Sequence, residues 1–130
     1  MAKAMREPTF WTLTALAQAA RHGYGIIQEV SRLSEGQVTL QAGTLYAALD
    51  RLAAEGLVEV DRVEKVDGRD RRYYRLTQGG VSALSAEVER LGHNARTAGA
   101  QLAIRTGPSA ADPPAARPSP ARPGFGPATA

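Results

Sequence analysis

The stretch that decides the fold is AGTLYAALDRLAAEGL, residues 42–57. Leu45, Leu49 and Leu52 recur at helical spacing, so they form one apolar stripe along a helix. Gly56 follows at the position where a residue with left-handed backbone commonly ends a helix. We therefore expect one face of this helix to pack on a core and the opposite face to remain free.

Two helices are predicted before this stretch. The first covers Pro8–Ala20, because proline suits a first helical turn and apolar residues then recur at helical spacing. Glycines in residues 22–25 interrupt the pattern, and a second, short helix follows with Ile26 and Leu33 among its inward side chains. The deciding helix is then the third, over Ala42–Glu55.

A hairpin and a long helix are predicted after it. Residues 57–63 alternate in part like a half-buried strand, Asp67-Gly68 strongly favours a two-residue turn, and residues 72–76 return. Thr77 is a good N-cap for a last helix over Gln78–Arg105. The fold class is mainly α with a small β-hairpin. We expect a winged helix-turn-helix DNA-binding domain in residues 1–77, a dimerisation helix in 78–105, and a disordered Pro/Ala-rich tail in 106–130.

Composition narrows the choice of function. The chain has 130 residues, a net charge of +3 and no cysteine, which excludes disulfides, thiolate metal sites and thiol nucleophiles. No apolar run approaches the roughly 18 residues that span a bilayer, and the N-terminus lacks the apolar stretch of a signal peptide. We expect a soluble, cytoplasmic protein with no membrane partner.

The free face of the third helix is a candidate for the major groove, which admits one helix and is read mainly by that helix's N-terminal residues. Small residues there permit close approach to bases. Asp50 does not fit this pattern, since its carboxylate would repel phosphate unless it lies past the groove or pairs with Arg51 or another basic side chain. The predicted DNA contacts on this helix are Gln41, Gly43, Thr44, Tyr46, Ala47 and Arg51.

The hairpin carries a second signal for nucleic acid. From Arg62 to Arg75 six basic side chains stand against three acidic ones, a local excess equal to the net charge of the whole chain. Arg69, Arg71 and Arg72 are therefore predicted to contact phosphate or the minor groove. The alternative is a solvated hairpin whose arginines only maintain solubility.

The last helix carries an apolar seam of the coiled-coil kind, which three short helices cannot cover alone. A second copy of the chain is the expected cover, with help from Leu13 of the first helix; packing within one chain is the alternative. The seam residues are Val81, Leu84, Val88, Leu91, Ala95, Ala98 and Leu102.

Several short stretches together resemble the PadR family of transcriptional regulators. They are His22-Gly23-Tyr24, Gly43-Thr44-Leu45-Tyr46, Leu49, Arg51-Leu52, Glu55-Gly56-Leu57, Arg72-Tyr73-Tyr74, Leu76-Thr77 and Gly80. The resemblance implies a winged-helix dimer built by the first and last helices, usually a repressor, with small aromatic or lipophilic effectors. The family commonly has proline where this chain has Ala47, a mild departure.

We thus expect a sequence-specific DNA-binding regulator, a ligand-responsive repressor acting as a homodimer on an inverted repeat. Trp11 is the candidate ligand-binding residue, because an indole at a dimer seam can stack on an aromatic effector; simple interface packing is its alternative role. No catalytic, cofactor or metal motif is present, so we expect no enzyme. The rival functions are a protein–protein interaction module and a dimer that sequesters small molecules.

Overall fold

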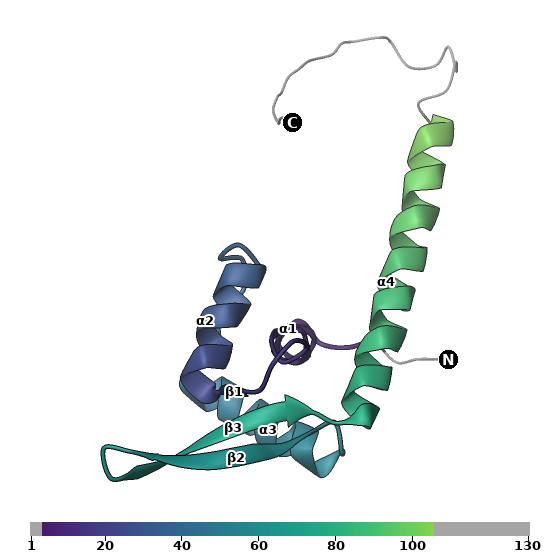
Figure 1. Ribbon diagram of the computed structural model, residues 1–130. Helices are drawn as coiled ribbons and strands as arrows, with labels where there is room; N and C mark the ends of the chain where they lie inside the picture. Colours follow the sequence, from purple (N-terminus) through teal and green to yellow (C-terminus); the bar gives the residue numbers. More distant parts are fainter. Residues whose placement is uncertain (1–3, 106–130) are drawn as a thin grey trace. The chain divides into compact units, whose positions relative to one another are not determined.

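The structure, a computed structural model, describes residues 4–105 and confirms the predicted fold class (Figure 1). The predicted disordered tail, 106–130, lies outside the described residues. The elements are α1 (Glu7–Ala15), β1 (Arg21–His22), α2 (Gly23–Leu33), α3 (Ala42–Ala54), β2 (Val58–Val66), β3 (Arg69–Leu76) and α4 (Gln78–Arg105).

The hairpin prediction is confirmed, but the sheet has a third strand. β2 and β3 pair from Val58↔Leu76 to Val66↔Arg69. Asp67 and Gly68 in the turn have φ of 52° and 77°, the left-handed backbone that tight hairpin turns require. β1 adds to the other edge of β3, giving the antiparallel order β1-β3-β2. β1 has only two residues, so no alternation of apolar and polar residues in the sequence could predict it.

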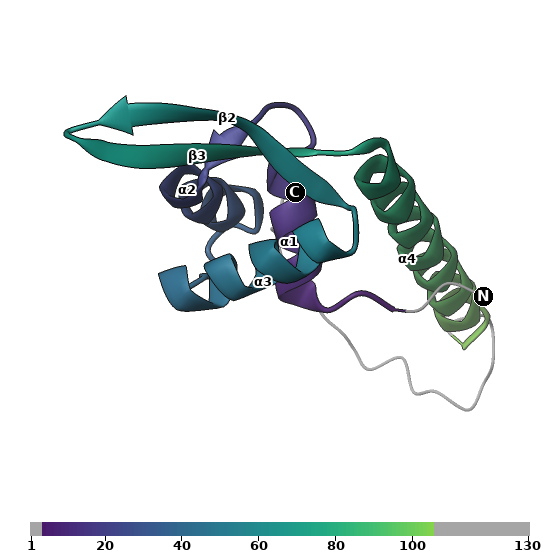
Figure 2. The same ribbon diagram turned by 90° about the horizontal axis from the view of Figure 1, so that it is seen from below.

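The core lies between the sheet and the three helices α1, α2 and α3, which cover one face of it, while the hairpin tip extends beyond them (Figure 2). The predicted stripe of Leu45, Leu49 and Leu52 is fully buried there. Val58 and Tyr74 cover the stripe from the sheet. The opposite face of α3 is left in solvent beside the hairpin.

The first helix is shorter than predicted, ending at Ala15 and not at Ala20. Arg21 Nε donates a 2.8 Å hydrogen bond to the Ala15 carbonyl, and the Leu16 N–H bonds back to Leu13 in a tight turn. The turn buries Leu16 and frees the following residues to reach the sheet as β1. Ala17, which lies beyond the end of the helix, is exposed as a result.

Thr77 caps α4 as predicted: its hydroxyl accepts a 3.0 Å hydrogen bond from the Gly80 N–H and donates one of 2.6 Å to the Gly56 carbonyl.

The chain divides into two compact units, residues 1–92 and 93–130. The first holds the sheet, α1 to α3 and the start of α4. The described part of the second, residues 93–105, is helical with every side chain exposed.

Candidate nucleic-acid interface

The exposed face of α3 carries the residues predicted to read bases. Gln41, Gly43, Thr44, Tyr46 and Ala47 are all exposed. Gln41 is the N-cap residue, yet its side chain makes no capping hydrogen bond, which leaves the first backbone N–H groups of the helix for an anion. The small side chains along this face permit another molecule to approach the helix closely.

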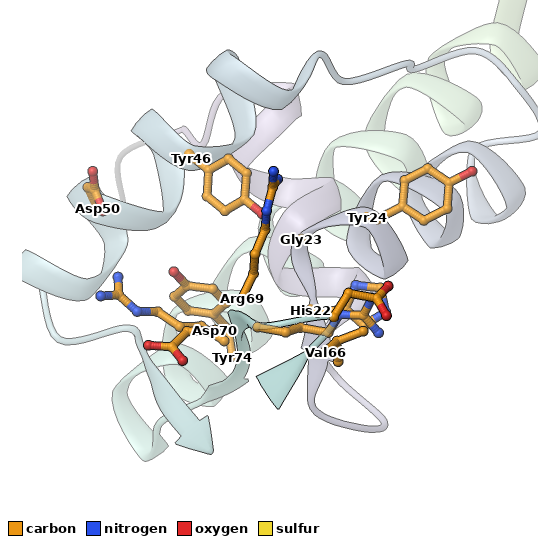
Figure 3. Close-up of a pocket in the computed structure, with 12 residues that line it drawn as sticks. His22, Gly23, Tyr24, Tyr46, Asp50, Val66, Arg69, Asp70 and Tyr74 are labelled. Carbon is orange, nitrogen blue, oxygen red and sulfur yellow. The ribbon is translucent and has the colours of Figure 1, made fainter. Parts of the chain in front are cut away.

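A groove of about 930 Å³ separates this helix from the hairpin (Figure 3). α2 contributes Tyr24, which is 65% exposed, and α3 contributes Tyr46 and Asp50. The full lining is His22, Gly23, Tyr24, Tyr46, Asp50, Val66, Asp67, Arg69, Asp70, Arg71, Arg72 and Tyr74. Of these, Tyr46, Arg69, Arg71 and Arg72 were predicted contacts, so the fold brings the helix and hairpin predictions to one site.

Tyr46 occupies its position because Gly23 has no side chain. A Cβ built on Gly23 would lie 2.2 Å from Tyr46 Oη and 2.7 Å from Tyr46 Cζ. The phenol ring therefore lies directly over the first residue of α2. This contact places an aromatic hydroxyl at the rim of the groove, beside the start of two helices.

His22 joins the helices to the hairpin, a role that sequence reasoning missed. Its Nδ1 accepts a 3.2 Å hydrogen bond from the Gly25 N–H, which caps α2. Its ring meets the Tyr73 ring edge-on, with centroids 5.3 Å apart. Burial lowers the pKa of His22, the charge of Arg71 lowers it further, and Glu64 opposes the shift. A histidine just before a helix that starts with glycine was the available signal.

The hairpin arginines fall into two groups. Among residues 4–105, Arg69, Arg71 and Arg72 form no ion pair, although Arg71 lies close enough to Glu64 to help lower its pKa. The neutralised cations are Arg62 with Asp61 and Glu64, Lys65 with Asp70, and Arg75 with Glu59 and Asp61, at 2.7 to 3.3 Å. The hairpin cations without an ion pair are thus the three predicted contact arginines, which line the groove together with Asp50, Asp67 and Asp70.

Arg51 is turned towards α1 rather than along the groove. Its Nη2 donates a 3.0 Å hydrogen bond to Thr9 Oγ1, and Nη1 lies 3.9 Å from Glu55 Oε2. Arg51 is absent from the groove lining, whereas Asp50 is part of it. This side chain thus binds another helix of its own chain, and its predicted contact with DNA stays a prediction.

The predicted dimer residues differ in how much surface they offer. Leu13 is 0% exposed in the chain's own core, so its assignment to an interface is wrong: a side chain without free surface cannot contact a partner. Leu84 is partly buried on the same core. The remaining seam residues of α4, which are Val81, Val88, Leu91, Ala95, Ala98 and Leu102, are exposed.

Trp11 packs against the core, and its ring meets the Phe10 ring edge-on with centroids 5.1 Å apart. Its Nε1 is buried with no hydrogen-bond partner in the described part of the chain.

Residues 4–105 hold no group of three metal-binding side chains. None of the described helices is long and apolar enough to cross a membrane.

A helix-turn-helix followed by a β-hairpin defines a protein of the winged-helix class. Residues 12–86, more than half of the chain, match the transcriptional regulator PadR-like family. The chain belongs to this family, as its sequence predicted. Members of the family regulate transcription, and the chain is not an enzyme.

Individual relatives agree with this assignment. The chain is 43% identical over 75 residues to the transcriptional regulator Rv3488 of Mycobacterium tuberculosis, covering 58% of this chain and 66% of that one. A PadR family regulator from Clostridium difficile has a TM-score of 0.63 at 21% identity, covering 75% of this chain and 99% of that one. Bacillus subtilis PadR, solved in complex with operator DNA, has a TM-score of 0.58 at 20% identity, covering 64% and 48%. These structures share the fold.

Proposed function

We propose that the chain is a ligand-responsive repressor that binds an inverted repeat of DNA as a homodimer. The observation that carries the proposal is the groove: Tyr46 and Asp50 of α3 line one side of it, and three hairpin arginines that form no ion pair within residues 4–105 line the other. The small exposed residues Gly43, Thr44 and Ala47 lie on the same helix as Tyr46. A duplex offers both of the matching partners, base edges in the major groove and phosphates beside them.

In this proposal α3 enters the major groove with Gln41, Gly43, Thr44 and Ala47 nearest the bases. Tyr46 and the arginines Arg69, Arg71 and Arg72 bind phosphate or the minor groove. Asp50 is then the one acidic group of α3 in the groove, where its carboxylate can accept from a cytosine amino group. The Bacillus subtilis relative bound to operator DNA supports a duplex as the partner.

A second copy of the chain is the proposed cover for the apolar face of α4. Val88 is 55% exposed, and Val81 and Leu91 lie beside it at helical spacing. An apolar hollow of about 410 Å³ between Ala17, Leu76 and the start of α4 continues this surface. Burying such a face stabilises a dimer by about 25 cal/mol per Å² of apolar area removed from water. A two-fold dimer would present two α3 helices to half-sites about 34 Å apart.

The effector is proposed to be a small aromatic or lipophilic molecule that meets Trp11. The indole is only partly buried, so part of its ring surface is open for an aromatic molecule to stack on, although its Nε1 is buried. An effector changes DNA affinity only if it binds two dimer states differently. Quenching of Trp11 emission by phenolic compounds, with release of DNA at the same concentrations, would support this part of the proposal.

The test is a fluorescence-anisotropy titration against DNA from upstream of the protein's own gene, with a scrambled duplex as control and several salt concentrations. We expect tight, sequence-selective binding whose affinity falls steeply with salt. Binding that is insensitive to salt, or absent, would favour a protein partner instead. Sedimentation equilibrium of the protein, free and bound, measures the proposed dimer.

A further inference from the structure

One hydrogen bond links the base-reading helix to the first helix. Thr9 in α1 is 6% exposed, and its Oγ1 accepts from Arg51 Nη2 of α3 across 42 residues of chain. Among residues 4–105 it is the only hydrogen bond between side chains of two different helices. Its donor is charged, and such bonds are roughly twice as strong as neutral ones.

The geometry around Arg51 fixes the direction of this link. Glu55, the C-cap residue of α3, lies one helical turn after Arg51, with its Oε2 3.9 Å from the second terminal nitrogen of the guanidinium. The Arg51 guanidinium thus contacts Glu55 on its own side of the interface and Thr9 of α1 at the same time. It can add to the buried leucine stripe in holding α3 at one rotation about its axis, and that rotation decides which residues face the groove.

The same short segment also reaches α4. Met5 packs against the core together with Leu84 of α4, and its backbone lies close enough to Glu87 to help lower the pKa of that carboxylate. Glu87 is only 3% exposed, and Arg90 Nε donates a 2.9 Å hydrogen bond to its Oε1. The Arg90 guanidinium lowers the pKa of Glu87 most, burial opposes it, and the Met5 backbone lowers it further. Residues 5–9 therefore lie near the start of α4 at one end and bind α3 at the other, all within the first compact unit.

We propose that residues 5–9 form a positioning strut: Thr9 holds Arg51, and with it the base-reading helix, at a fixed orientation relative to residues 78–92 of α4. In a dimer joined through α4, the strut sets the distance and angle between the two reading helices. Thr9 is a positioning residue, because a buried hydroxyl cannot touch DNA. The inference rests on the proposed DNA-binding dimer.

The test compares two valine variants of the full chain. Thr9→Val removes the acceptor with little change of shape. Thr14→Val is the matched control, since its hydroxyl bonds at 2.7 Å to the Phe10 carbonyl within α1 itself. Each variant is titrated with inverted repeats whose spacer is lengthened and shortened by single base pairs. We expect Thr9→Val to lose about tenfold at the best spacer, equal to about 1.4 kcal/mol, and far less at neighbouring spacers. Thr14→Val should keep the wild-type profile.

Salt dependence and a second variant separate the remaining explanations. Thr9→Val should keep the wild-type salt slope, because it removes no phosphate contact, and Arg51→Met should reproduce its spacer profile. A slope reduced by about 0.9 per subunit in Arg51→Met would overturn the proposal, by making Arg51 a phosphate contact. A wild-type spacer profile with only a lower melting temperature in Thr9→Val would also overturn it. Wild-type protein that binds no duplex selectively would instead refute the proposed function, and the strut with it.

Discussion

Arg72 and Arg75 lie three residues apart on β3, yet only Arg75 is neutralised by its neighbours. Arg75 Nη2 lies 2.7 Å from Glu59 Oε2 and Nη1 lies 3.3 Å from Asp61 Oδ1, whereas Arg72 has no ion pair within residues 4–105 and lines the groove. An already paired guanidinium has little charge left to offer a phosphate. We therefore predict that Arg72→Ala weakens DNA binding and that Arg75→Ala changes it little.

The size of the effect follows from counterion release. Each phosphate contact adds about 0.9 to the slope of log affinity against log salt concentration. A dimer carries Arg72 twice, so Arg72→Ala should lower the slope by about 1.8. When the salt concentration rises fourfold, from about 50 to about 200 mM, the wild-type affinity should therefore fall about 12-fold more than the affinity of Arg72→Ala.

The assay is fluorescence anisotropy with one labelled duplex at four or more salt concentrations. Arg75→Ala, the matched control from the same strand, should keep the wild-type slope. Circular dichroism melting curves establish that both variants are folded. Equal slopes for the two variants would refute the reasoning, since they would show that the ion pairs on the hairpin do not decide which arginines meet phosphate.

Three further outcomes concern stability. A Cβ on Gly80 would lie 2.1 Å from a backbone carbonyl oxygen, so Gly80→Ala should lower the free energy of unfolding, measured in urea, by about 1–3 kcal/mol. Gly99 has open space around it, so Gly99→Ala should raise the free energy of unfolding by up to about 1 kcal/mol. Equal values for the two variants would contradict the packing argument. Burial lowers the pKa of His22 from 6.5, so the unfolded chain takes up the proton first and stability should fall as pH drops below 6.5. His22→Asn retains a capping acceptor and should flatten that slope; an unchanged slope would rule out His22 as its source. The guanidinium of Arg90 lowers the pKa of Glu87 below 4.5, so the carboxylate's stabilising effect is complete above pH 4.5 and is lost as pH falls below it. Glu87→Gln should remove this part of the acid transition, and a curve that keeps it would disprove the assignment.

The parts of the fold that the sequence predicted well are those with strong local signals. Leu45, Leu49 and Leu52 repeat at the helical period, and Asp67-Gly68 adopts the backbone that its turn type demands. Both patterns are decided within a few residues of chain. The arginines along the groove were predictable for a related reason, because an excess of charge in one hairpin is visible in its composition.

The features that were missed depend on contacts between distant residues. β1 exists because His22 pairs with Tyr73. A strand of two residues is too short to show the alternation of apolar and polar residues from which a strand is predicted. Leu13 was predicted at an interface, but whether an apolar helix residue lies in the core or on the surface is decided by the elements that cover it. The bond between Arg51 and Thr9 was missed because only the folded chain brings Thr9 within reach of the guanidinium, while the contact of Arg51 with DNA stays a prediction.

Gly23 and Tyr46 constrain each other's substitution. A methyl group at position 23 would overlap the phenol ring, so a chain with a larger residue there must carry a smaller side chain at position 46 or hold its aromatic ring elsewhere. The two positions are 23 residues apart in sequence and should change together among relatives. Correlated substitution at this pair, in an alignment of many family members, would reveal the same contact from sequence variation alone.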